Sequence, residues 1–123
     1  PAQIAELLVL HKQLEDEVAD RDRFFAANEL FHTKLLEVAD NRWRNQMVAD
    51  LRKVMKLNRA QSLLKAGRIE QSLAEHVAIM AALSKRNPGS AQAAMCAHIT
   101  SGLEAAGESP ASNRPFIHSI ESY

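Results

Sequence analysis

The sequence predicts an all-α fold, an antiparallel helical bundle. Its 123 residues are dominated by strong helix formers such as Ala, Leu, Glu and Lys, while Gly and Pro number only four each. Apolar residues recur at helical spacing along most of the chain, and no Val- and Ile-rich run suggests a strand. Because the segments between the apolar stripes are short, consecutive helices are expected to run antiparallel.

The first two of five expected helices span about 2–19 and about 22–39. Asp22 is expected to cap the second helix or to lie in its first turn. The apolar stripe of the first helix is Ile4, Leu7, Leu8, His11, Leu14 and Val18. The inward face of the second is Phe24, Phe25, Asn28, Phe31, His32, Leu35 and Ala39.

Three more helices are expected at about 42–61, 68–85 and 91–106. Asn87–Ser90 gives the strongest turn signal in the chain, and Ser90 is the expected N-cap of the last helix. The predicted inward residues of the three helices are, in order, Met47, Leu51, Val54, Met55 and Asn58; Ile69, Leu73, His76, Met80 and Leu83; and Ala94, Met95, His98, Ile99, Gly102 and Leu103.

The bundle domain is expected to span 1–106. Gly, Ser and Pro become frequent beyond it, so 107–123 is expected to be a C-terminal tail, either poorly ordered or forming a short extra element. His118 falls in this tail and is expected to be solvated. The chain begins at Pro1 rather than Met, which suggests a processed product or a piece of a longer protein.

Charge and composition exclude several classes of function. Lys plus Arg and Asp plus Glu both count 15, and a net charge of zero disfavours nucleic-acid binding by this chain alone. The single cysteine, Cys96, excludes an internal disulfide and a Cys-based zinc site, and it suits a reducing cytoplasm. No apolar run approaches the roughly 20 residues of a membrane span, and no signal peptide is visible. The expectation is a cytoplasmic protein.

The placement of the histidines is the most informative feature. His32, His76 and His98 lie in the apolar stripes of three different helices. Imidazole is costly to bury without partners, so one such residue alone is commonly a core histidine bonded to a carbonyl. Three on inward faces of one small bundle indicate a metal site in the core, with chance convergence as the alternative. His11, on the stripe of the first helix, is expected to be a core packing residue, with a supporting or pocket role as the alternative.

Asn28 lies four residues before His32, so both side chains project from the same face of one helix. Three imidazoles and one amide oxygen suit a divalent ion such as zinc, nickel, manganese or iron, with positions left open for water or a carboxylate. Because Asn is neutral, this site is expected to bind the ion more weakly than one with Asp.

Several segments, in order and spacing, match one known pattern. They are Asn28-Glu29-Leu30-Phe31-His32 with Leu35 and Ala39-Asp40-Asn41, then Leu51-Arg52, Arg59 and Arg68, then Ser72-Leu73-Ala74-Glu75-His76-Val77-Ala78-Ile79, and finally Ala93-Ala94-Met95-Cys96-Ala97-His98-Ile99. Together they resemble the signature of the FCD domain, the C-terminal ligand-binding domain in the fatty-acid-regulator branch of GntR-type bacterial transcription regulators. The resemblance covers about 4–106.

This resemblance implies an all-α domain that binds a small organic-acid effector over a metal ion held by one Asp and three His. The three His positions fall on His32, His76 and His98, and the Asp position falls on Asn28, which departs from the pattern. Zinc or nickel is the foremost expectation for the metal. The resemblance also implies a homodimer, and DNA binding through a winged helix-turn-helix domain that is absent from these residues.

The effector's carboxylate is expected to meet an arginine, because a guanidinium binds a carboxylate through two hydrogen bonds. Arg59 matches a position where the family often has Arg, and Arg52 is the second candidate. Glu75, beside His76, is expected to be a surface group or to support the site, and not to be a ligand.

Three functions are compatible with an all-α bundle that carries inward histidines. The preferred one is an effector-binding and dimerisation domain of a GntR-type regulator. The alternative is a metal-free structural or dimerising bundle with core histidines. A metalloenzyme is disfavoured, because no inward acid lies beside the three histidines to act as a general base.

Overall fold

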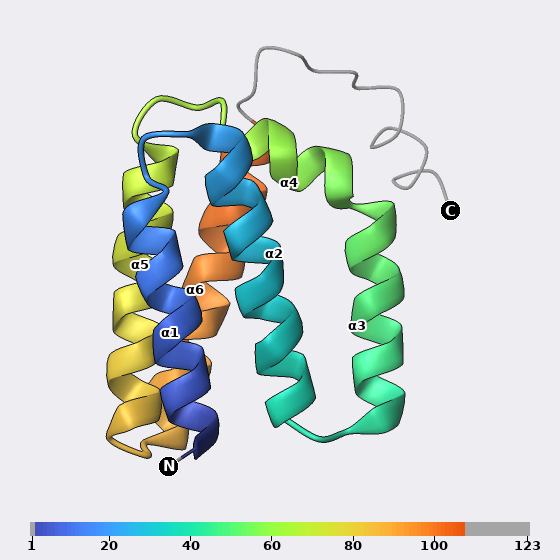
Figure 1. Cartoon of the computed structure of the whole chain (residues 1–123). Helices are drawn as coiled ribbons and strands as arrows, with labels where there is room; N and C mark the ends of the chain where they lie inside the picture. The colour runs from blue at the N-terminus through green and yellow to red at the C-terminus, as the bar shows by residue number, and fades with distance from the viewer. Residues whose placement is uncertain (1, 108–123) are drawn as a thin grey trace.

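The computed structural model describes residues 2–107, which form six helices and contain no strand, so the predicted all-α class is confirmed. In chain order they are α1 (Ala2–Asp16), α2 (Arg21–Val38), α3 (Arg42–Val54), α4 (Lys56–Ser62), α5 (Arg68–Ser84) and α6 (Pro88–Gly107). Figure 1 shows α1, α2, α5 and α6 as a bundle, with α4 across one end and α3 standing beside α2. The predicted tail and His118 lie outside the described residues.

The hydrophobic core lies between α1, α2 and α5. Leu7, Leu14, Phe24 and Phe31 are fully buried there. Each buried side chain of this size stabilises the fold by about 1.5–3 kcal/mol, so these four anchor α1 to α2. His11 is also buried in this layer, edge-on to the ring of Phe31, as expected of a packing residue. None of the described helices has the length and hydropathy to cross a membrane.

Side-chain caps set the start of α2. Asp20 caps this helix, and its carboxylate accepts hydrogen bonds from the backbone N–H groups of Asp22 and Arg23. Of the two places expected for Asp22, the structure shows the first turn, where its negative charge faces the positive end of the helix dipole. The cap sets where α2 begins, and the packing of Phe24 and Phe31 in the core turns the face that carries Asn28 and His32 toward the interior.

The start of α6 differs from the prediction. The helix begins at Pro88, three residues early, and Asn87 takes the capping role by accepting a hydrogen bond from the backbone N–H of Ser90. Proline suits the first helical position, because the backbone N–H that proline lacks would have no partner within the helix at that position. Ser90 therefore belongs to the first turn, and its prediction as N-cap was wrong.

The predicted helix over 42–61 is two helices, α3 and α4, which meet at Met55 (φ −91°, ψ 6°). The expected burial of its apolar stripe was wrong, since Met47, Leu51 and Val54 are 67%, 61% and 79% exposed. All of α3 lies within the described residues, and none of its side chains is buried. Figure 1 shows α3 standing beside α2 and apart from the other helices of the bundle, and residues of α2, α3 and α4 together line a pocket.

Part of the predicted inward face of α6 is also exposed. His98 is buried, but Ile99 and Leu103 are 54% and 58% exposed. Both side chains, with Leu51 and Met55 from the opposite side, line a pocket rather than a packed interface. Three of the apolar residues whose burial was wrongly predicted, Leu51, Ile99 and Leu103, thus lie around one cavity.

Candidate metal and effector site

Three histidines from three helices converge in the interior. His32 of α2, His76 of α5 and His98 of α6 are 7%, 0% and 7% exposed. The Nε2 atom of His98 lies 3.2 Å from Nε2 of His32 and 3.1 Å from Nε2 of His76. The fold therefore brings together the three residues that the sequence singled out.

These spacings fit a shared divalent ion. Imidazole nitrogens bind zinc at about 2.0–2.1 Å, so two of them at tetrahedral or octahedral angles lie about 2.9–3.4 Å apart. One potential ligand atom from each of the three histidines lies within 4.8 Å of the other two. If the three rings were together only because they pack in the core, their nitrogen atoms would not need to face a common position. The observed convergence therefore favours a shared ligand.

Burial keeps the three rings neutral. It lowers the pKa of His32 well below the ordinary value, and, together with the charge of His98, it lowers the pKa of His76 to about 2. Burial also lowers the pKa of His98, against the opposing effect of the Glu75 carboxylate. A neutral imidazole keeps one nitrogen lone pair free, which is the form that binds a metal ion.

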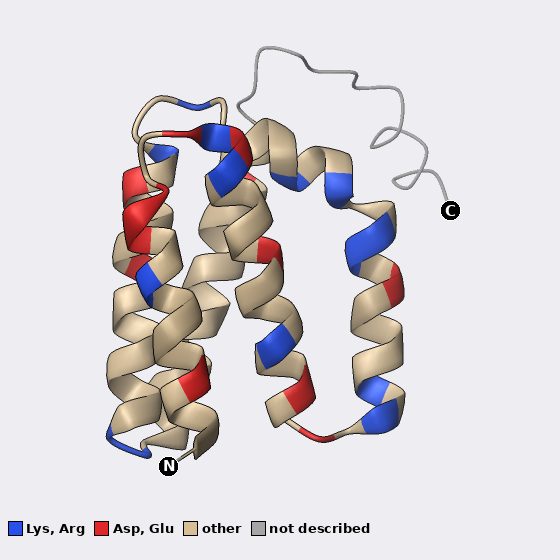
Figure 2. Ribbon diagram, in the orientation of Figure 1, with Lys and Arg blue, Asp and Glu red and all other residues tan. Residues whose placement is uncertain are grey.

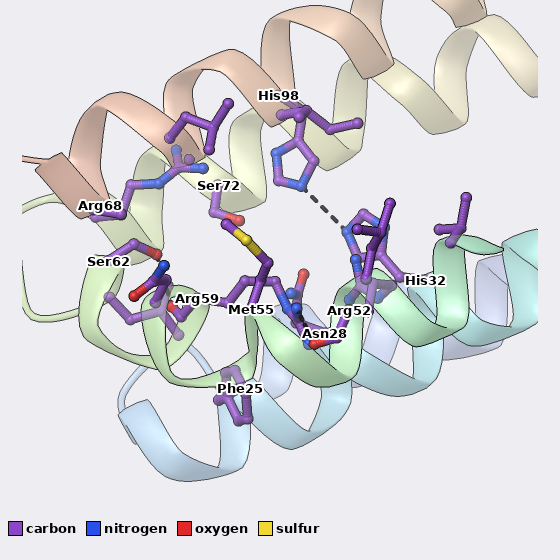
Figure 3. Close-up of a pocket in the computed structure, with 18 residues that line it drawn as sticks. Phe25, Asn28, His32, Arg52, Met55, Arg59, Ser62, Arg68, Ser72 and His98 are labelled. Carbon is purple, nitrogen blue, oxygen red and sulfur yellow. Dashed lines mark hydrogen bonds between the residues drawn. The ribbon is translucent and has the colours of Figure 1, made fainter. Parts of the chain in front are cut away.

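Asn28 provides an unpaired oxygen beside this cluster. Its Oδ1 atom is buried and has no hydrogen-bond partner among the described residues. Buried polar atoms nearly always have a partner, so an orphaned oxygen one helical turn from His32 suits a cation. Figure 3 shows Asn28, His32 and His98 around the same cavity. The residues present therefore fit a divalent ion.

The pocket has a volume of about 250 Å³ and reaches His32 and His98, while His76 lies behind them. Its polar lining residues are Asn28, His32, Arg52, Asn58, Arg59, Ser62, Arg68, Ser72 and His98. Its apolar lining includes Phe25, Leu51, Met55, Leu63, Ile99 and Leu103. Such a cavity, mostly apolar with a few convergent polar groups, is typical of a small-molecule site.

Both expected effector arginines line this pocket, and both already bind a carboxylate. Arg59 donates from Nε and Nη2 to the two oxygens of Glu29, at 3.0 and 2.8 Å, and Arg52 donates to the same side chain at 2.8 Å. Glu29 lies within the motif, but only the fold places it opposite both arginines, so its role was not expected from the sequence. The hydrogen bonds of both guanidinium groups are therefore shared with Glu29.

A second charged group was also missed. Arg68, 3% exposed, donates from Nη1 to Gln71 and, at 2.6 Å, to Oε1 of Glu75. The other oxygen of Glu75 lies 3.2 Å from Nδ1 of His98. The spacing of Arg68, Gln71 and Glu75 along one helix face was the available signal. Glu75, expected to be a surface group or to support the site, does contact a histidine of the cluster, but that histidine is His98 rather than its chain neighbour His76.

Charged residues are unevenly distributed over the described helices. Figure 2 shows residues of both signs on α1, α2 and α3, only Lys and Arg on α4, and almost no charge on α6. The α6 segment contains one charged residue, Glu104, in 20 residues.

The matching family model is the FCD domain, which matches residues 1–101. The chain belongs to the FCD domain family, the regulatory, effector-binding domains of GntR-type transcription regulators. No curated protein and no solved structure matches the chain. The family resemblance expected from the sequence is thus confirmed, and the family is one of regulatory domains.

Proposed function

We propose that this domain binds a small organic-acid anion in the pocket between α2, α3, α4 and α6, next to a divalent metal ion. The ion would be held by His32, His76, His98 and Asn28, with zinc or nickel foremost. The observation that carries the proposal is the convergence of three neutral imidazoles at the pocket, beside the orphaned Oδ1 of Asn28. A bound ion supplies positive charge that attracts a carboxylate oxygen.

The arginines would add a second anchor for the anion. Arg52 and Arg59 both line the pocket, and their shared partner Glu29 is 26% exposed at its side chain. An anion that takes over some of these hydrogen bonds would change the contacts between α2 and α4. In a homodimeric regulator, such a change would shift the populations of two arrangements of attached DNA-binding domains. The domain would act in the cytoplasm.

Metal analysis with a matched pair of variants tests the proposal. Purified protein is expected to contain about one divalent ion per chain, and a chelator should lower the melting temperature. His76→Ala should abolish binding, whereas His11→Ala, which also removes a buried histidine, should destabilise the fold but keep the metal. A metal-free protein whose affinity for zinc is the same before and after His76→Ala would contradict the metal site.

Effector binding is tested separately. Melting the metal-loaded protein with lactate, succinate and citrate should raise the transition for at least one acid, and chelation should reduce the shift. The remaining alternative, a structural or dimerising bundle with core histidines, is supported if neither metal nor any organic acid changes the melt.

A further inference from the structure

We infer that Glu75 is a positioning residue that selects the protonation tautomer of His98 and thereby directs its Nε2 lone pair into the histidine cluster. The inference rests on the proposed metal site for its biological purpose. Its structural basis is a chain of contacts from Arg68 through Glu75 to His98.

The first step concerns which nitrogen of His98 bears the proton. A neutral imidazole has one N–H donor and one acceptor nitrogen. Nδ1 of His98 lies 3.2 Å from Oε2 of Glu75, and a carboxylate only accepts hydrogen bonds. The proton is therefore held on Nδ1, and Nε2 is left as the acceptor that faces His32 and His76.

The second step concerns what holds the Glu75 carboxylate in place. Its Oε1 accepts a hydrogen bond from Arg68 at 2.6 Å, and Arg68 is 3% exposed. Because the guanidinium of Arg68 can only donate hydrogen bonds, the atom of residue 75 that faces it must be an acceptor oxygen. A second hydrogen bond, to Gln71 of the same helix, holds the guanidinium in place.

The third step follows from the geometry of a near-isosteric change. In Glu75→Gln the new amide keeps the shape of the carboxylate but has one acceptor and one donor end. Because Arg68 can only donate, the amide oxygen turns toward it, and the amide NH₂ turns toward Nδ1 of His98. Nδ1 must then accept, and the proton moves to Nε2, where it blocks the lone pair that faces the cluster.

Side-chain ¹⁵N NMR tests the tautomer without a metal ion. In chelator-treated wild-type protein near pH 7.5, His98 is expected to have its proton on Nδ1, and in E75Q on Nε2. Glu70→Gln is the matched control, since it removes the same charge from an exposed site on α5 and should leave the His98 spectrum unchanged. A wild-type His98 with its proton on Nε2 overturns the inference, and this reading does not depend on the folding of any variant.

Zinc affinity, measured by competition with a chelating dye, gives the second reading. E75Q is expected to lose about 10- to 100-fold in zinc affinity, the range typical of losing a carboxylate that orients a ligand histidine. E70Q should stay within threefold of wild type. If E75Q keeps both the wild-type tautomer and the wild-type affinity, the inference is wrong. If E75Q reverses the tautomer in a protein that never binds zinc, the positioning role stands and the proposed metal function fails.

Discussion

Arg59 binds Glu29 through two hydrogen bonds: Nε donates to one carboxylate oxygen at 3.0 Å and Nη2 donates to the other at 2.8 Å. Its remaining nitrogen, Nη1, donates to the backbone carbonyl of Arg52. All three nitrogens of the expected anion-binding residue are thus engaged within the protein. Glu29 occupies the place that the carboxylate of an effector would take.

Removing this internal carboxylate should strengthen anion binding. Glu29→Gln keeps the shape of the side chain but adds one net positive charge beside the pocket, so the affinity for citrate is expected to rise about fivefold, or ~1 kcal/mol. Isothermal titration of the metal-loaded protein measures this. Glu37→Gln, an exposed change on the same helix, is the control and should have little effect. Weaker citrate binding in E29Q would show that Glu29 orients the arginines rather than competing for them.

Restoring a charged ligand should tighten metal binding. Asn28→Asp replaces a neutral oxygen beside His32 with a carboxylate, and zinc affinity is expected to rise about tenfold or more because the added charge stabilises the cation. Dye competition measures it. Asn58→Asp adds the same charge at an exposed residue of the same pocket and should change zinc affinity far less. Equal gains in both variants would point to a general charge effect and away from ligation by residue 28.

The metal-free protein should lose stability in mild acid. The folded-state pKa values of His32, His76 and His98 are lowered, so below about pH 6.5 the unfolded chain binds more protons than the native one. Full stability holds above that pH and is lost progressively as the pH falls toward the folded-state values. Each histidine contributes up to about 1.4 kcal/mol per pH unit, or ~4 kcal/mol for all three.

Urea unfolding of chelator-treated protein at pH 7.5, 6.5 and 5.5 measures this dependence. In His76→Leu the slope below pH 6.5 should fall by roughly a third, because one of the three linked groups is gone. A free energy of unfolding that stays constant from pH 7.5 to 5.5 would mean that the histidines are protonated in the native state.

Alanine substitutions should distinguish the core from the face of α3. Leu14 is fully buried, and Leu14→Ala is expected to cost about 2–5 kcal/mol of the free energy of unfolding. Leu51 is 61% exposed, and Leu51→Ala should cost less than about 1 kcal/mol. Urea unfolding compares them at one protein concentration. A loss for Leu51→Ala as large as that for Leu14→Ala would mean that α3 is covered in solution.

The histidine cluster could be predicted because it depends on helix faces alone. His32, His76 and His98 each lie in an apolar stripe, and burying those stripes against one another brings the rings together. The contact between Glu75 and His98 could not be predicted in this way. It spans 23 residues and depends on how far α5 and α6 are shifted along their axes, which no local pattern determines.

The errors over 42–61 have a related cause. An apolar stripe shows which face of a helix avoids water, but it does not name the surface that covers it. The stripe of α3 turns partly toward a pocket, so Leu51 stays exposed. The break at Met55 occurs without Gly or Pro, the residues that ordinarily signal a helix end, and no sequence feature marked it.

The exposed inner face of α3 ties ligand binding to the position of that helix. Leu51 and Met55 form one wall of the pocket, and Ile99 and Leu103 of α6 form part of the other. A ligand between them would supply the apolar contacts that α3 lacks. Part of the free energy of binding would therefore come from, and depend on, the movement of α3 toward α6. Trp43, the single tryptophan of the chain, is 77% exposed in the first turn of α3, so its fluorescence would report a movement of that helix.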